Sequence, residues 1–169
     1  EDISSSFPII FIDTLHHFSE TIEFVERVED RYDIHSNLYR YKCAFANTRE
    51  SFEKYVDDKQ LWLSNPLIYD QLVKVEPLQR ALNELNIKIW ITGRRRDQGG
   101  NRSSLRILEI DEDDGRYKLN PLAFWTNQMV WEYISKNKVI CNPLYYQGYK
   151  SIGDEMTTKP VSENDDERS

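Results

Sequence analysis

The sequence predicts an α/β fold in which helices cover both faces of a mostly parallel sheet. Short apolar segments rich in β-branched residues alternate along the chain with longer segments of helical periodicity, and no internal repeat interrupts this order. The chain has 169 residues, of which 39% are hydrophobic. One core of ordinary size suits this length and composition, so we expect a single domain over residues 1–169.

The first half of the chain predicts two strands separated by a helix. The sequence FPIIFID at Phe7–Asp13 is short, apolar and closed by a carboxylate, as in strands buried within parallel sheets. A helix should follow with Ser19 as its N-cap, and residues 37–41 predict the next strand. The helix repeats apolar residues along one face, namely Ile22, Val25 and Val28. Residues 43–69 alternate irregularly, and we expect mixed structure with some helix there.

The second half continues the alternation of helix and strand. Residues 74–77 open a helix, because proline suits the first helical turn, and residues 87–92 predict a strand. Residues 105–110 and 116–119 flank the turn sequence Asp-Asp-Gly, which predicts a β-hairpin. Thr126 should cap a last helix. The expected core positions are Leu78, Leu82 and Leu85 in the first of these helices, and Met129, Val130, Tyr133 and Ile134 in the second.

Charge and cysteine content restrict the functions that the chain can have. The 22 Lys and Arg residues against 29 Asp and Glu residues give a net charge of −7, which argues against nucleic-acid or membrane partners. Cys43 and Cys141 show no metal-ligand spacing and suit a reducing cytoplasm, where we expect the protein. The chain starts at Glu1 close to a strand and stops in the acidic residues 162–169, so we expect it to be incomplete at both ends.

Arginines crowd into the loop that follows the strand predicted at residues 87–92. The loop, residues 93–106, contains five of them: Arg94, Arg95, Arg96, Arg102 and Arg106. Guanidinium groups match the oxygens of phosphate and sulfate, and ligands of α/β sheets bind beyond the carboxyl ends of strands. The loop lacks a Walker-type glycine-lysine motif, so it predicts an oxyanion site of another kind. Surface ion pairs with the carboxylates of residues 109–114 are the alternative interpretation.

Five collinear segments resemble the 3′-phosphoadenylyl sulfate (PAPS) reductase family, whose fold is the adenine nucleotide α-hydrolase-like fold. They cover nearly the whole chain in the order of the family's motifs. The segments are FIDTLHHFSETIEF, YDQLVKVEPLQRALNELN, TGRRRDQGGNR, NPLAFWTNQMVWEYI and PLYYQGYKSIGDEMTTKPV.

The resemblance implies a set of substrate-binding residues. Lys74, Arg95, Arg96 and Arg102 would meet the phosphate and sulfate groups, and Arg168 would belong to a further substrate-binding segment. The remaining members are Asp13 and Thr14 in the nucleotide pocket, with Gly93 and Gln98 in the arginine loop. A solvated lysine at position 74 and a strand-end carboxylate at position 13 remain alternatives. We expect His16 and His17 to be loop residues. Ser151, Gly153 and Asp154 match the family's SxGD segment, for which turn formation is also a sufficient reason.

Departures from the family's motifs are informative as well. Related adenylyl sulfate reductases hold an iron–sulfur cluster through adjacent cysteines at the positions of Tyr69 and Asp70, so the resemblance implies the cluster-free type that uses PAPS. The nucleophilic cysteine of the family lies in a C-terminal ECGxH motif that this chain does not contain. The family's N-terminal phosphate loop is missing too. We therefore expect no catalytic residue here, and we expect Cys43 and Cys141 to be structural.

The activity implied by the resemblance is reductive. A thiolate attacks the sulfur of PAPS, adenosine 3′,5′-bisphosphate leaves, and thioredoxin or glutaredoxin releases sulfite for sulfate assimilation. The implied partners are therefore PAPS, its bisphosphate product and thioredoxin, and the family is often homodimeric. This chain by itself is expected to be inactive. Two alternatives remain: an FAD synthetase-like adenylyltransferase of the same fold, and a nucleotide-binding module without catalysis.

Overall fold

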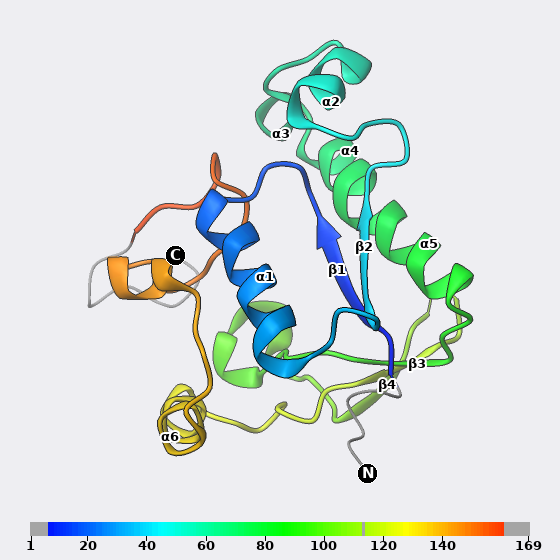
Figure 1. The fold of residues 1–169 in the computed structure, drawn as a ribbon. Coiled ribbons are helices and arrows are strands. Elements are labelled where there is room, and N and C mark those ends of the chain that lie inside the picture. The colour runs from blue at the N-terminus through cyan, green and yellow to red at the C-terminus, as the bar shows by residue number, and fades with distance from the viewer. Residues whose placement is uncertain (1–6, 113, 161–169) are drawn as a thin grey trace. The chain divides into compact units, whose positions relative to one another are not determined.

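The computed structural model describes residues 7–112 and 114–160, which form two compact units (Figure 1). The first unit comprises residues 7–85 and 142–160, and the second comprises residues 86–112 and 114–141. In chain order, the first unit contains β1 (Ile9–Asp13), α1 (Ser19–Tyr32), β2 (Leu38–Lys42), α2 (Arg49–Val56), α3 (Leu61–Ser64), α4 (Pro66–Asp70), η2 (Gln71–Val75), α5 (Glu76–Glu84) and η5 (Pro143–Gln147). The second contains β3 (Ile89–Ile91), η3 (Arg96–Gln98), η4 (Gly100–Arg102), β4 (Leu108–Ile110), β5 (Tyr117–Leu119) and α6 (Asn127–Asn137).

In the first unit, β1 and β2 form a parallel pair connected through α1. The register runs from Ile9 opposite Leu38 to Asp13 opposite Lys42, so both carboxyl ends lie at the same edge (Figure 1). α5 packs against both strands. The two strands and the intervening helix are confirmed. Ser19 as the N-cap of α1 is wrong: it is the first helical residue, and its hydroxyl donates to the neighbouring Glu20 carboxylate at 3.1 Å instead of capping the helix.

Residues 43–69 form three short helices, as expected of a mixed region with some helix. The Thr48 side chain caps α2 by accepting from the Ser51 N–H, and Asn65 caps α4 immediately before Pro66. These helices enclose the main apolar cluster of the first unit. Its buried members are Cys43, Ala46, Phe52, Leu61, Tyr69 and Val73.

Helix α5 begins at Glu76 with Pro77 in its first turn, as expected, but it does not start from a loop, because it continues α4 through the π-helical turn η2. The Glu76 N–H donates to the Gln71 carbonyl oxygen, five residues earlier, which is the spacing of a π turn. Proline has no N–H to donate and its ring crowds the preceding turn. The wide turn lets Pro77 follow an existing helix, an arrangement that the sequence did not reveal. Of the expected core positions of α5, Leu82 is buried, and Leu78 and Leu85 are half-buried.

The second unit is a three-stranded sheet of order β3-β5-β4 with the single helix α6 among its described residues. β3 pairs with β5 in parallel, and β4 pairs with β5 antiparallel, which confirms the predicted hairpin. Gly115 takes a φ of +73° in the connection, where glycine is favoured; residue 113 lies outside the described residues. With parallel pairs in both units and helices between the strands, the α/β class is confirmed.

Thr126 caps α6 as expected, since its side chain accepts from the Met129 N–H. The predicted core stripe of α6 is wrong in part. Val130 and Ile134 are half-buried, but Met129 and Tyr133 are exposed. The spacing of apolar residues identifies one face of a helix and does not identify what covers that face. No helix within residues 7–112 and 114–160 combines the length and the apolar character that a membrane span requires.

Candidate functional site

The arginine loop begins where β3 ends and is shaped by two 3₁₀ turns, η3 and η4. The Arg96 N–H donates to the Ala123 carbonyl oxygen at 2.9 Å, and the Arg102 N–H donates to the Gly99 carbonyl oxygen at 3.1 Å. Gly99 and Gly100 take φ values of +69° and +57°, which favour glycine and allow the chain to pass from one turn to the next. Backbone hydrogen bonds, within the loop and to residue 123, therefore help to hold it.

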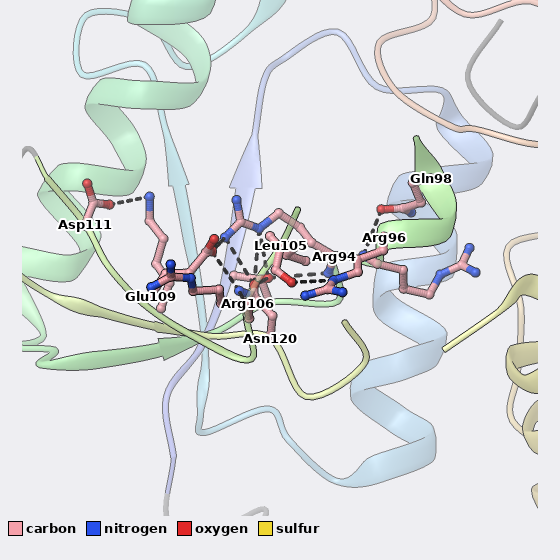
Figure 2. A network of polar contacts seen from close by, with 11 residues as sticks. Arg94, Arg96, Gln98, Leu105, Arg106, Glu109, Asp111 and Asn120 are labelled. Atoms are coloured by element: carbon pink, nitrogen blue, oxygen red, sulfur yellow. Dashed lines mark hydrogen bonds and ion pairs between the residues drawn. The ribbon is translucent and has the colours of Figure 1, made fainter. Parts of the chain in front are cut away.

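Arg94 is tied into a polar network at the base of the loop (Figure 2). Its guanidinium group donates to the Glu109 carboxylate at 2.8 Å and to the Asn120 Oδ1 atom at 3.2 Å. Asn120 is completely buried, and its Nδ2 atom donates to the Arg106 carbonyl oxygen at 2.8 Å and to Glu109 at 2.9 Å. The ion-pair interpretation of the loop is therefore right for Arg94.

Arg95 is only 5% exposed. Its Nη1 atom lies 3.4 Å from the Asp97 Oδ2 atom, and the same oxygen accepts the Asn127 N–H at 2.6 Å. Asn127 is the first residue of α6, where the helix dipole favours a carboxylate. Arg95 thus joins the loop to the start of α6 through Asp97, and its buried side chain offers little surface to a ligand.

Arg96 and Arg102 are both half-buried, and Arg96 lies against neutral groups. The Arg96 Nε atom donates to the Leu105 carbonyl oxygen at 2.7 Å (Figure 2). Its guanidinium carbon lies 4.2 Å from the centre of the Phe124 ring. Arg96 has no carboxylate partner within residues 7–112 and 114–160. The Gln98 side chain accepts from both Arg102 and the Arg95 N–H, so it orders the loop as expected. Gly93 is exposed, and a side chain there would meet no atom within 4 Å.

Asp13 and Thr14 follow β1 in the first unit. The Asp13 Oδ1 atom accepts the Leu15 N–H at 2.8 Å and thereby holds a turn in which Leu15 has a φ of +65°. This contact fits the strand-end role that was the alternative for Asp13. Thr14 is buried, and its hydroxyl donates to the Asp154 Oδ1 atom at 2.5 Å.

Asp154 is the buried centre of a polar network that the sequence did not indicate. Its Oδ2 atom accepts from the Tyr69 hydroxyl and from the Lys74 ammonium group, each at 3.1 Å. Lys74 also donates to Asp70 at 2.8 Å. The segment around Asp154 does form a turn, because the Thr157 N–H donates to the Asp154 carbonyl oxygen. In the same network, the four-residue spacing of Asp70 and Lys74 indicates their ion pair, but no local pattern indicates the contact of Lys74 with Asp154.

Burial and charge change the acidity of this network. Burial first, and the Asp154 charge second, raise the pKa of Tyr69 far above its ordinary value, so Tyr69 is a neutral hydrogen-bond donor. Burial alone would lower the pKa of Lys74, but its contacts with Asp70 and Asp154 outweigh burial and raise that pKa. Lys74 therefore remains a cation although it is partly shielded from water.

His16 lies in the loop beside this network. The ring is 2% exposed, and its Nδ1 atom is 2.7 Å from the Thr14 carbonyl oxygen. The Nε2 atom is buried without a hydrogen-bond partner among the described residues, next to the rings of Phe52 and Tyr69. Burial lowers the pKa of His16, so the ring is neutral. Cys43 is buried and Cys141 half-buried, and both are free thiols.

The predicted site residues thus fall into two groups. Thr14 and Lys74 meet at Asp154 in the first unit, and Asp13 adjoins Thr14. The members in the second unit share the arginine loop: Gly93, Arg95, Arg96, Gln98 and Arg102. Arg168 lies outside the described residues.

Comparison with known proteins gives a consistent result. Residues 2–160 match the family described as phosphoadenosine phosphosulfate reductase domain. A phosphoadenosine phosphosulfate reductase of Emericella nidulans is 47% identical over 161 residues, which are 95% of this chain and 52% of that protein. The crystal structure of the Candida auris PAPS reductase, a phosphate complex, superposes with a TM-score of 0.81 at 43% identity, over 93% of this chain and 74% of that one.

A third likeness concerns the fold alone. Candida glabrata FMN adenylyltransferase in complex with FAD and pyrophosphate has a TM-score of 0.59 at 21% identity, over 92% of this chain and 46% of that one. This chain spans little more than half the length of the Emericella nidulans relative. The match of residues 2–160 and the high identity to its members show that the chain belongs to the phosphoadenosine phosphosulfate reductase family.

Proposed function

We propose that the full-length gene product reduces PAPS to sulfite and adenosine 3′,5′-bisphosphate in sulfate assimilation. Family membership supports this reaction. The structural observation that carries the proposal is the state of Arg96, a half-buried guanidinium group held by a carbonyl oxygen and an aromatic ring. With no carboxylate partner in the described part of the chain, its positive charge is left for a ligand. A phosphate or sulfate group is the ligand that such a cation suits.

The Candida auris relative gives independent support, because it was crystallised as a phosphate complex. In this chain, Arg96 and Arg102 are the proposed anion ligands of the arginine loop, with Gln98 holding Arg102 in place. The exposed Gly93 leaves room for a ligand to approach the backbone. Arg95, which is buried, is proposed to act mainly through its backbone and through Asp97.

Lys74 is the proposed anion ligand of the first unit, with Thr14 and Asp13 at the nucleotide. Lys74 has the charge for this role, and its side chain is 46% exposed, so its ammonium group is accessible. Arg168 is proposed to contribute from a segment outside the described residues. No role in binding is proposed for His16 or His17.

The proposed chemistry needs positive charge where the sulfur–oxygen bond breaks. A cysteine thiolate attacks the sulfur of PAPS and forms an enzyme S-sulfonate, and the bond electrons leave with the phosphate oxygen of adenosine 3′,5′-bisphosphate. Guanidinium groups at that phosphate stabilise the developing charge. Cys43 and Cys141 are not proposed as the nucleophile. Cys43 is buried at 3% exposure, where a substrate has little access to its sulfur.

Thioredoxin or glutaredoxin is the proposed reductant that releases sulfite from the S-sulfonate. We propose that no iron–sulfur cluster takes part. Tyr69 and Asp70, which stand where cluster-binding relatives have cysteines, have oxygen atoms that are already engaged with Asp154 and Lys74. Neither offers a thiolate, the ligand that such clusters require.

Calorimetry of this chain with adenosine 3′,5′-bisphosphate tests the anion site. Hydrogen bonds to charged groups contribute about 1.5–3 kcal/mol, so Arg96→Ala and Arg102→Ala should each weaken binding roughly tenfold or more. The matched control is Arg31→Ala, which removes an exposed arginine in the last turn of α1 and should leave the affinity unchanged. Tight binding that ignores both loop substitutions would contradict the proposal.

Sulfite release by the full-length gene product tests the reaction itself. Labelled PAPS and reduced thioredoxin should give sulfite, and replacing the cysteine of the family's C-terminal ECGxH motif with serine should abolish it. Magnesium-dependent adenylyl transfer without sulfite would favour the adenylyltransferase alternative. Bisphosphate binding with neither reaction would favour the non-catalytic module.

A further inference from the structure

Asp154 has the environment of a carboxylate that holds other groups in place. It is 2% exposed and forms an isolated antiparallel bridge with His17, in the loop that follows β1. Its two oxygens accept from Thr14, Tyr69 and Lys74, at 2.5, 3.1 and 3.1 Å. A buried carboxylate without such donors would be strongly destabilising, so these contacts fix both the position of Asp154 and the positions of its donors.

Lys74 is shared by two carboxylates of very different exposure. The Asp154 side chain is 1% exposed, whereas the Asp70 side chain on the other side of the ammonium group is 53% exposed. An exposed ion pair in water is weak and is readily exchanged for another anion. A buried carboxylate that accepts three hydrogen bonds is not exchanged in this way.

We propose that Asp154 is a positioning residue of the substrate site: it anchors the Lys74 ammonium group, while an anionic oxygen of the substrate displaces Asp70 from the same group. This inference rests on the proposed role of Lys74 in binding. Asp154 need not touch the substrate, since it acts through Lys74. The two carboxylates thus have opposite effects on the same lysine, because one holds it and the other competes with the ligand.

A simple charge argument makes a different prediction from this one. Both carboxylates lie close to Lys74, and removal of either negative charge should strengthen the binding of an anion if charge alone matters. The positioning role requires that Asp154→Asn weakens binding. The sign of the effect of Asp154→Asn therefore separates the two accounts, and Asp70→Asn is the matched control because it removes the same charge from the same ammonium group.

The test is calorimetry of the 169-residue chain with adenosine 3′,5′-bisphosphate. We expect Asp154→Asn to weaken binding about tenfold, in keeping with the loss of a charged hydrogen bond at a buried site. We expect Asp70→Asn to strengthen it about twofold, the scale of an exposed ion pair. In a Lys74→Ala background, Asp154→Asn should have no further effect, which a merely structural role would not produce. Unchanged or tighter binding by Asp154→Asn would overturn the inference.

Two further measurements cover the remaining outcomes. If Asp154→Asn does not fold, Tyr69→Phe removes one donor to the same oxygen and should weaken binding about twofold to threefold; a folded Tyr69→Phe protein with unchanged affinity refutes the positioning role. If the wild-type chain binds no bisphosphate, the proposed function fails, and the inference is judged by NMR. The ammonium signal of Lys74 should then disappear in Asp154→Asn and persist in Asp70→Asn, and the reverse pattern refutes it.

Discussion

Removal of the Asn120 side chain tests how the arginine loop is held. Asn120 is completely buried and makes contacts with three surrounding segments. Its Nδ2 atom donates to the Arg106 carbonyl oxygen and to the Glu109 carboxylate, at 2.8 and 2.9 Å. Its Oδ1 atom accepts from the Thr92 hydroxyl at 2.5 Å and from the Arg94 guanidinium group at 3.2 Å. Asn120→Ala would remove all of these contacts at once.

The expected loss follows from the groups that would be left behind. A hydrogen bond contributes about 0.5–1.5 kcal/mol, or about 1.5–3 kcal/mol where one partner is charged. Asn120→Ala removes bonds to the backbone carbonyl of residue 106, to the Thr92 hydroxyl and to the charged Arg94 and Glu109 side chains. The Arg94–Glu109 ion pair would be weakened as well, so we expect Asn120→Ala to lower the free energy of unfolding by about 3–5 kcal/mol in total. A domain is typically stable by only about 5–15 kcal/mol, so the second unit should open frequently.

Hydrogen exchange followed by mass spectrometry measures this effect separately in each unit. Peptides from residues 86–112 and 114–141 should lose protection, and peptides from residues 7–85 should keep it. Asn101→Ala, at an exposed position of the same loop, is the matched control and should change protection little. A loss below about 1 kcal/mol in the second unit, or an equal loss in both units, would refute the account of Asn120 as the support of the loop.

Three further predictions concern stability. Thr126→Ala should cost about 1 kcal/mol and increase hydrogen exchange in the first turn of α6, whereas Thr126→Ser should not, since serine also caps. Phe52→Ala, in the core of the first unit, should cost about 3–5 kcal/mol in urea unfolding, and a loss under about 1 kcal/mol would contradict its burial. The lowered pKa of His16 means that the folded state disfavours its charged form. Stability should therefore be retained above the unfolded value of about 6.5 and fall as the pH drops below it; His16→Asn should remove this part of the dependence.

Much of the fold could be predicted because its determinants are local. The strand ending at Asp13, the hairpin around Gly115 and the cap at Thr126 each depend on a few neighbouring residues. Ser19 shows the limit of such reasoning, since serine favours the N-cap position, yet Ser19 is the first residue inside the helix and its hydroxyl donates to Glu20. Met129 shows another limit, because helical spacing does not say which side of a helix is covered.

The candidate site could be predicted as a loop but not as a set of contacts. Composition and position marked the arginines, yet only the structure distinguishes Arg94, paired with Glu109, from Arg96, stacked on Phe124. The hydrogen-bond network around Asp154 was not predicted, because its partner Thr14 lies 140 residues away in sequence. Contacts between residues so far apart in sequence produce no local periodicity, so a local sequence pattern cannot reveal them.

The single wide turn η2 makes the protein sensitive to the insertion or deletion of a residue at this point of the chain. Each residue of an α-helix advances the side-chain direction by about 100°, so one extra residue in a turn rotates the preceding helix against the following one. α5 faces β1 and β2, whereas Tyr69, at the end of α4, points to Asp154. Deleting one residue from Gln71–Val75 would restore a regular helix and bring these two faces out of phase. The number of residues in η2, more than their identity, therefore sets the angle between α5, which packs on β1 and β2, and the polar network around Asp154.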